Sequence, residues 1–143
     1  MKNRFQQIDP ICSHYHKSLL KKEGGEWNWP IALKPIDGYP LFMGWLHALL
    51  KVKSMVDEGL NLTTPLLVLC SSAGHVDSNS ENFRNVDILT DVNMTISLVP
   101  NIARTGKVQL VKNAIHDVFL SSLESRENAY DLTWEFLSDL FKI

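Results

Sequence analysis

Apolar residues recur at helical spacing in the middle of the first half of the chain. Phe42, Trp45, Leu46, Leu49, Val52 and Val56 form one stripe. Lys51, Lys53 and Asp57 lie opposite it, and Gly59 provides a stop, so we predict an amphipathic helix over 41–58. Before it, one helix fits after Pro10 within 8–20, and glycines and prolines break the rest of residues 1–39 into loops.

The second half of the chain alternates between strand and helix patterns. Leu66–Cys70 is a continuous apolar run, which is typical of a strand buried on both faces of a parallel sheet. A long polar loop over 71–85 follows, and then Thr90 or Asp91 is placed to cap a helix. That helix has Val92, Ile96 and Val99 as its inner face, Pro100 is expected to end or kink it, and a second strand is predicted over Lys107–Val111.

The chain closes with a long predicted helix. Ser121 and Glu124 match the S-x-x-E capping box, so we expect the helix to run over 123–141. Its expected buried face consists of Tyr130, Thr133, Trp134, Leu137 and Phe141.

Strand, helix, strand and helix in alternation favour an α/β fold with a parallel sheet covered by helices. The pattern yields only two convincing strands, and a two-stranded parallel sheet is too small to be stable alone. Either further strands escape the pattern, or the rest of the sheet belongs to another polypeptide or to a missing segment.

Composition narrows the class of protein. The chain has 143 residues, 45% of them hydrophobic and 21% charged, as expected of one ordinary soluble domain. Its net charge is −2 without a basic block, so we expect no nucleic-acid partner. No apolar run is long enough for a transmembrane segment, and the N-terminus lacks a signal-peptide core. Cys12 and Cys70 lie far apart, which suggests reduced thiols and a cytoplasmic location.

The strongest chemical signal is the pair Asp87 and His116. Asp87 lies in the loop after the first strand, and His116 lies 29 residues later in the loop after the second. Because parallel strands end at the same edge, both side chains are expected to project there. A buried carboxylate beside a histidine fixes its tautomer and stabilises the imidazolium, as a general base requires.

Other candidate groups have simpler explanations. Ser71 and Ser72 read as turn hydroxyls, because no strained elbow surrounds them. His14 and His16 lie near Cys12, but no third ligand cluster is close in sequence, so no metal site is predicted. His47 is expected on a helix surface, and His75 has no partner that the sequence assigns. The tryptophans are expected to be packing residues and not to form a ligand-binding site: Trp27, Trp29 and Trp45.

Three segments together resemble a known family. They are Pro65-Leu-Leu-Val-Leu-Cys70, Val86-Asp-Ile-Leu-Thr-Asp-Val92 and Asn113-Ala-Ile-His-Asp-Val-Phe-Leu-Ser121. They resemble the C-terminal half of an α/β-hydrolase, and within it the serine aminopeptidase or lysophospholipase-like branch. Upstream, Tyr15–Leu19, Gly25–Trp27, Leu33–Pro35 and Gly44–Trp45 resemble the segment after the lid of that branch, so the resemblance spans 15–137.

The resemblance implies a fold and a set of roles. Residues 1–40 would be the end of the lid region and a connector, and residues 41–143 the C-terminal part of the core, with the last two parallel strands and their flanking helices. His116 takes the position of the catalytic histidine and Asp87 that of the acid. Asp77 is the runner-up acid, because in many relatives the acid follows its strand closely. Asp117 is a poor candidate for the acid, since adjacent residues seldom point at each other.

The departures from the family are as informative as the matches. The family's nucleophile lies in G-x-S-x-G, and no two glycines of this chain are four residues apart. The chain is therefore expected to supply the acid and the base of an ester or amide hydrolase, without nucleophile or cofactor, and to be inactive alone. The expected partner is the missing N-terminal half or a second copy at the sheet edge. The alternative is a non-catalytic fragment or an association module that pairs through that edge.

Overall fold

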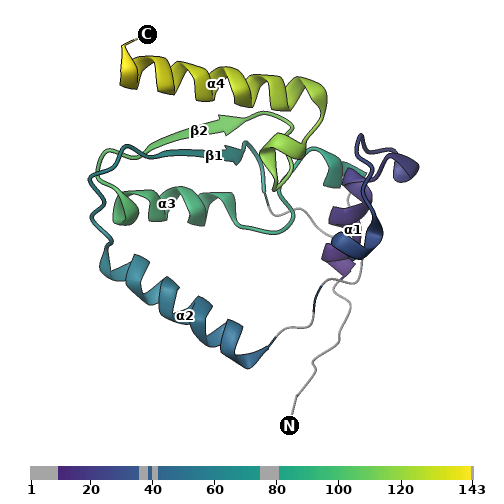
Figure 1. Cartoon of the computed structure of the whole chain (residues 1–143), viewed down its shortest axis with the longest axis horizontal. Coiled ribbons are helices and arrows are strands. Elements are labelled where there is room, and N and C mark those ends of the chain that lie inside the picture. The colour runs from purple at the N-terminus through teal and green to yellow at the C-terminus, as the bar shows by residue number, and fades with distance from the viewer. Residues whose placement is uncertain (1–9, 36–38, 40–41, 75–80, 143) are drawn as a thin grey trace.

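The structure is a computed structural model that describes residues 10–35, 39, 42–74 and 81–142. It is an α/β arrangement of three layers (Figure 1). Strands β1 (Leu67–Ser71) and β2 (Lys107–Val111) form the central layer. Helix α4 (Leu123–Phe141) covers one face, and α3 (Val92–Ile102) covers the other. On the side of α3, helix α2 (Met43–Glu58) lies farther from the sheet, while α1 (Pro10–Leu19) lies beyond the carboxyl ends of the strands.

The two strands pair in parallel, as the apolar run of the first one predicted. Leu67 is opposite Lys107 and Ser71 is opposite Val111, with α3 as the crossover between the strands. The second strand has its predicted bounds, and β1 begins and ends one residue later than predicted. In the described part of the chain these are the only strands of the sheet. The prediction of an α/β arrangement with two parallel strands is thus confirmed in the described residues.

Helix α3 begins where a local hydrogen bond dictates. Asp91 is the N-cap, and its carboxylate accepts hydrogen bonds from the backbone N–H groups of Asn93 and Met94, at 2.9 and 3.1 Å. These bonds satisfy two of the N–H groups that lack a partner at a helix start. Pro100 lies inside the helix, which continues to Ile102, so of the expected end or kink the end is ruled out.

The capping box predicted for the last helix is wrong. Ser122, not Ser121, occupies the N-cap of α4, and it makes no side-chain capping bond. The Ser121 hydroxyl instead accepts a hydrogen bond from the backbone N–H of Ile115 at 3.0 Å. The Ser121 hydroxyl, which the local pattern assigned to the start of the helix, therefore binds the preceding loop instead.

The buried face of α4 also differs from the prediction. Ser125 and Ala129 are its buried residues, whereas Tyr130, Trp134 and Phe141 are exposed. The helix approaches the sheet closely through small side chains, because Ala129 packs against Val111 in the core. Tyr130 contacts the ring of Phe119, with the ring centres 5.0 Å apart, while Trp134 and Phe141 are 63% and 65% exposed.

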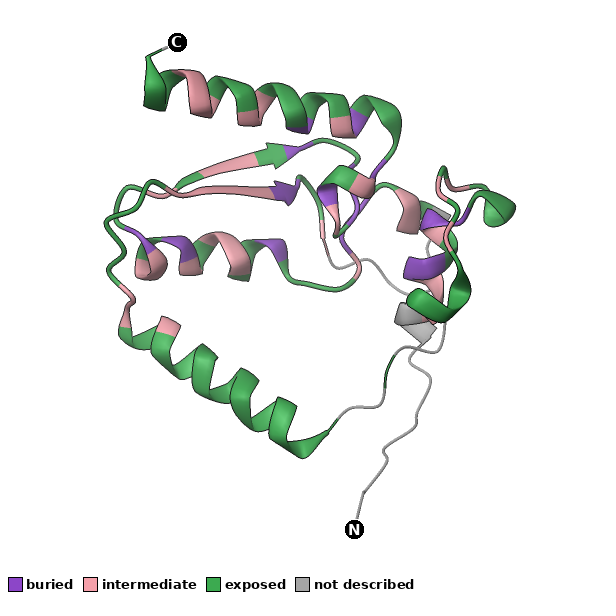
Figure 2. Ribbon diagram, in the orientation of Figure 1, coloured by how far each residue is buried: buried purple, intermediate pink, exposed green. Residues whose placement is uncertain are grey.

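Buried side chains gather in two clusters (Figure 2). The first joins α4 to the sheet and contains Val111, Ala114, Val118 and Ala129, with Leu69 and Leu132 packed against it. The second joins α1 to the loop after β2 and contains Tyr15, Leu19 and Ile115, with Trp27, Trp29, Ile88 and Leu120 packed against it. The packing predicted for Trp27 and Trp29 is confirmed.

Helix α2 forms with nearly the predicted bounds, yet none of its residues is buried. Its exposed large apolar residues are Met43, Trp45, Leu46, Leu49, Leu50, Val52 and Met55. Trp45, one of the predicted packing residues, is 54% exposed. The predicted apolar stripe is present, but of its residues on α2 only Val56, near the end that contacts α3, is half-buried.

None of the helices in the described ranges is long and apolar enough to cross a membrane.

Candidate functional site

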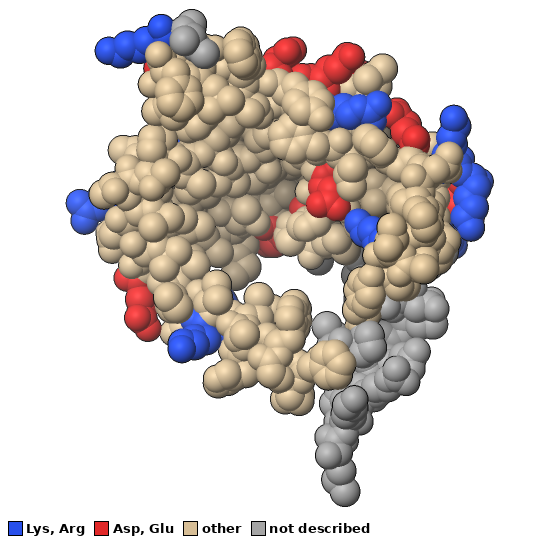
Figure 3. Space-filling model, in the orientation of Figure 1, with Lys and Arg blue, Asp and Glu red and all other residues tan. Residues whose placement is uncertain are grey.

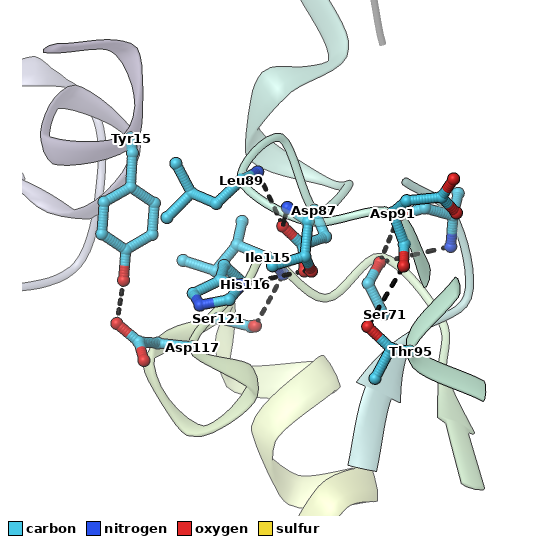
Figure 4. Close-up of polar contacts among 12 residues, drawn as sticks. Tyr15, Ser71, Asp87, Leu89, Asp91, Thr95, Ile115, His116, Asp117 and Ser121 are labelled. Atoms are coloured by element: carbon cyan, nitrogen blue, oxygen red, sulfur yellow. Dashed lines mark hydrogen bonds and ion pairs between the residues drawn. The ribbon is translucent and has the colours of Figure 1, made fainter. Parts of the chain in front are cut away.

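Asp87 and His116 meet beyond the carboxyl ends of the strands (Figure 4). They come from two loops, one between β1 and α3 and one between β2 and α4. His116 Nδ1 lies 2.9 Å from Asp87 Oδ2. The Asp87 side chain is 7% exposed and that of His116 is 36% exposed, so the carboxylate is enclosed while the imidazole reaches the surface.

The Asp87 carboxylate is held by its own loop. It accepts hydrogen bonds from the N–H groups of Leu89 and Thr90, at 2.8 and 3.0 Å, and from the Thr90 hydroxyl at 2.6 Å. The Asp87 N–H donates to the carbonyl of Ala73 at 2.9 Å, which ties this loop to the end of β1. Gly74 permits that approach, because an added Cβ would lie 2.7 Å from Val92 Cγ2.

These contacts determine the charge of Asp87. Burial alone would raise the pKa of the carboxyl group, but hydrogen bonds from His116, Thr90 and Leu89 outweigh it and lower the pKa from 3.8 to about 2. Asp87 is therefore ionised at neutral pH. With Asp87 ionised, Nδ1 of His116 is the donor in this pair, and Nε2 is the nitrogen left without a proton in the neutral ring.

The loop that carries His116 has a rigid base. Ala114 and Ile115 are buried, and the Ile115 N–H donates to Ser121, which closes the loop on itself. Asn113 adopts a left-handed conformation with φ of 56°, a conformation that asparagine tolerates better than most residues. The imidazole is therefore presented from a fixed backbone. Among the described residues no hydrogen bond forms at Nε2, which lies on the edge of the ring away from Asp87.

An apolar groove of about 650 Å³ reaches His116. It extends between β1 and α4 as far as Pro65 and Leu137, with His116 and Asp117 as its ionisable residues at the carboxyl end of β1. The remaining lining consists of Leu66, Leu67, Leu69, Val118, Phe119, Leu120, Thr133 and Phe136. His116, whose Nε2 makes no hydrogen bond to Asp87, therefore lies at one end of a largely apolar groove.

A second polar group lies beside His116. The Tyr15 hydroxyl donates a hydrogen bond to the Asp117 carboxylate, and Lys34 Nζ lies 3.6 Å from the same carboxylate and 4.8 Å above the Tyr15 ring. The Tyr15 ring meets the imidazole of His116 edge-on, with the ring centres 6.3 Å apart. Burial raises the pKa of Asp117 and lowers that of Lys34. Asp117 contacts Tyr15 and Lys34 and not His116. This agrees with the expectation that adjacent residues seldom point at each other.

The segment after α1 braces the same loop. The Trp27 indole N–H donates to the carbonyl of Leu120 at 2.7 Å. Glu26 accepts from the Leu123 N–H at 3.1 Å and pairs with Arg126 at 2.7 Å. Sequence patterns missed these contacts because each joins residues about a hundred positions apart, and no periodic or motif signal marks such pairs.

The remaining candidate residues lie in turns, in ring contacts or outside the described residues. Ser71 is a turn hydroxyl, since its Oγ donates to the carbonyl of Ala73 at 2.8 Å. The ring of His14 lies 5.5 Å from that of Phe83, at a tilt of 60° between the ring planes. No cluster of potential metal ligands occurs within the described ranges. His75 and Asp77, the runner-up acid, lie outside the described residues.

Cys70 is buried at the end of β1, and burial together with the charge of Asp87 raises the pKa of its thiol. A thiol with a raised pKa is a poor nucleophile at neutral pH, because the thiolate is the reactive form. Cys70 is therefore not an activated nucleophile beside the Asp87–His116 pair.

Comparisons with family models, with curated proteins and with solved structures return no match to this chain.

Proposed function

We propose that this chain supplies the acid and the general base of a serine hydrolase that acts on carboxylic esters or amides, with the fold of the C-terminal half of an α/β-hydrolase. The observation that carries the proposal is the contact of His116 Nδ1 with the buried, ionised Asp87 at 2.9 Å, which leaves Nε2 as the second ring nitrogen of a residue that lines the apolar groove. Two carboxyl-end loops contribute this pair, in the order acid then histidine that triads of α/β-hydrolases have.

In the proposed reaction His116 moves one proton twice. Nε2 takes the proton of a serine hydroxyl while the serine oxygen attacks the substrate carbonyl, and the imidazolium then returns that proton to the leaving alcohol or amine. Water repeats the sequence on the acyl-enzyme, releasing the carboxylic acid and restoring the serine. Asp87 stays ionised throughout, since its pKa of about 2 is far below that of an imidazolium.

The nucleophile of this proposal comes from outside the 143 residues, because the sequence contains no G-x-S-x-G. The oxyanion hole would come from the same outside polypeptide. We therefore expect the chain alone to show no esterase activity above buffer, since nucleophile and oxyanion donors dominate acyl transfer. Hydrolysis by the chain alone that depended on His116 would contradict this part of the proposal.

The test combines this chain with a polypeptide that carries a G-x-S-x-G motif and restores ester hydrolysis. His116→Ala is expected to lower kcat for p-nitrophenyl butyrate by a factor of at least about 10⁴, as loss of a triad member does. Asp131→Asn, on the exposed face of α4, is the matched control and should keep the wild-type rate. A wild-type rate in His116→Ala would sink the assignment.

The acid is tested in the same assay. Asp87→Asn should lower kcat by about 10⁴, because an amide at this position favours the wrong histidine tautomer. Asp77→Asn, in the runner-up acid, should leave the rate nearly unchanged. The reverse outcome would move the acid role to Asp77 and leave Asp87 as a structural carboxylate.

The alternative of a non-catalytic association module rests on the incomplete sheet alone. Such a module would have no need of a buried carboxylate that orients a surface histidine. The Asp87–His116 contact therefore favours the hydrolase proposal over this alternative.

A further inference from the structure

The imidazole of His116 makes one hydrogen bond within the described residues, from Nδ1 to Asp87 at 2.9 Å. A single bond fixes the distance of one ring atom but lets the rest of the ring pivot about it. The His116 side chain is 36% exposed, so solvent leaves room for such a pivot. A group that transfers protons has to stay within about 0.5 Å of its working position. A second contact is therefore needed to hold the ring.

Tyr15 of α1 supplies a contact of this kind. Its ring meets the imidazole of His116 edge-on, at 82° between the ring planes and with the ring centres 6.3 Å apart. This separation lies within the range of about 4.5–7 Å over which aromatic rings attract, and edge-on contact is one of their preferred arrangements. Tyr15 and Asp87 lie on opposite sides of the imidazole in Figure 4, so the ring is contacted from both sides.

The Tyr15 ring is itself fixed in place. It is 5% exposed and shares a buried cluster with Ile115. Its hydroxyl donates to the Asp117 carboxylate, and Lys34 Nζ lies 4.8 Å from the centre of its ring. Ile115 and Asp117 are the two neighbours of His116 in the chain. Tyr15 is therefore tied to both sides of the histidine as well as to its ring, and it does not turn aside when the imidazole moves.

We propose that Tyr15 is a positioning residue for His116, whose ring confines the imidazole to the orientation in which Nδ1 faces Asp87. The consequence for hydrolysis, that Nε2 is held in one place as a general base, rests on the proposed function. The confinement of the imidazole rests on the ring contact and the buried cluster, and it is a property of the chain by itself.

Two simpler roles of Tyr15 lead to different results. A residue that only fills the core would be matched by Leu19, which is 1% exposed in the same cluster but offers no ring to the imidazole. A residue that acts only through its hydroxyl and Asp117 would lose its effect in Tyr15→Phe, which keeps the ring. Under our proposal, removal of the Tyr15 ring is the change that frees the imidazole.

The tautomer of His116 reports the orientation of its ring. A ring held at Asp87 keeps its proton on Nδ1, whereas a ring that turns into solvent places the proton on either nitrogen. Nitrogen NMR shifts of the isotope-labelled chain give the ratio of the two forms at about pH 9, where imidazole side chains are neutral. The signals of His116 are assigned by their absence from His116→Ala.

Three variants separate the roles. The ratio of the Nδ1–H form to the Nε2–H form should fall about fivefold or more in Tyr15→Leu, which keeps an apolar side chain but no ring. In Tyr15→Phe it should stay within about twofold of the wild-type ratio, because the ring contact remains. Leu19→Val is the matched control. It thins the same cluster and should also stay within about twofold.

A second measurement needs no variant, so it applies even where Tyr15→Leu does not fold. In the wild-type chain the ring protons of Tyr15 and His116 should show nuclear Overhauser contacts, because the two rings meet edge-on.

Three outcomes would overturn the proposal. They are a wild-type tautomer ratio in folded Tyr15→Leu, an equal fall of the ratio in Tyr15→Phe or Leu19→Val, and the absence of Overhauser contacts between the two rings. None of these measurements involves a substrate. A wild-type rate of ester hydrolysis in His116→Ala would overturn the proposed function and leave the positioning result intact, so the two failures are distinguishable.

Discussion

At the scale of single residues, the site depends on how two carboxylates are held. Asp87 is enclosed and accepts hydrogen bonds from Leu89, Thr90 and His116, so its charge is stabilised and its pKa is low. Asp117 is next to His116 in sequence but binds Tyr15 and Lys34, and burial raises its pKa. The two carboxylates therefore differ in role because their donors differ.

Asp87→Asn should destabilise the chain in a pH-dependent way. The folded-state pKa of about 2 lies below the usual 3.8, so the contribution of this group is present above pH 3.8 and is lost as the pH falls toward 2. We expect Asp87→Asn to lower the free energy of unfolding by about 2 kcal/mol at pH 7 and by much less near pH 2. Urea unfolding at both pH values measures this, with Asp131→Asn as the control. A loss that is equal at both pH values would contradict the prediction.

Tyr15→Phe should loosen the loop of His116 without removing the ring packing. The variant loses only the hydroxyl that donates to Asp117, which should cost about 1 kcal/mol of unfolding free energy. The pKa of Asp117, already raised by burial, should rise further, as followed by carboxyl NMR. Tyr130→Phe is the control, because Tyr130 is exposed on α4. An unchanged pKa of Asp117 would show that the hydroxyl contributes nothing to its charge.

At the scale of elements, the two helices that flank the sheet begin in different ways. For helix α3 the sequence offered Thr90 or Asp91 as the N-cap, and in the structure the N-cap is Asp91. Helix α4 has Ser122 at its N-cap without a side-chain capping bond, because Ser121 serves the loop of His116. The start of α3 depends on hydrogen bonds between neighbouring residues, whereas the start of α4 depends on a tertiary contact.

Asp91→Ala and Ser122→Ala should therefore differ in cost. Asp91→Ala leaves the N–H groups of Asn93 and Met94 without their acceptor and should lower the free energy of unfolding by about 1 kcal/mol. Ser122→Ala removes no capping bond and should cost less than about 0.5 kcal/mol. Thermal unfolding followed by circular dichroism compares the two. Equal losses would mean that Asp91 does not act as a cap.

At the scale of the whole molecule, packing is uneven. Two small clusters of buried residues hold α1, the sheet and α4 together, while α2 contributes no buried residue (Figure 2). Large apolar residues of α2 and α4 are exposed, and β1 has a free edge beside an apolar groove. These features lie on different sides of the two-stranded sheet, because α4 covers one face and α2 lies beyond α3 on the other (Figure 1). In the space-filling view α2 stands apart from the body, with an opening between them (Figure 3).

Leucine-to-alanine changes should report this unevenness. Leu19 is 1% exposed within the cluster around Tyr15. Leu19→Ala should lower the free energy of unfolding by roughly 2–5 kcal/mol. Leu49, 49% exposed on α2, should cost less than about 0.5 kcal/mol in the chain alone. Denaturant unfolding of both variants measures the difference. A large loss for Leu49→Ala in the chain alone would mean that α2 is packed in solution.

Local patterns were sufficient for much of the backbone and for the central pair of side chains. The apolar run of β1, the cap at Asp91 and the helical stripe of α2 are properties of neighbouring residues, so the sequence determined where these elements form. The position of Asp87 and His116 after successive parallel strands was enough to predict their meeting, because such strands end at one edge.

Only the tertiary structure decided which side chains the elements bury and which distant groups meet. Ala129, not Tyr130 or Trp134, faces the sheet, because close approach of α4 requires a small side chain there. Tyr15 reaches Asp117 across 102 positions, a separation that no periodic pattern encodes. Burial and long-range hydrogen bonding depend on how layers pack, and that information is absent from spacing along one chain.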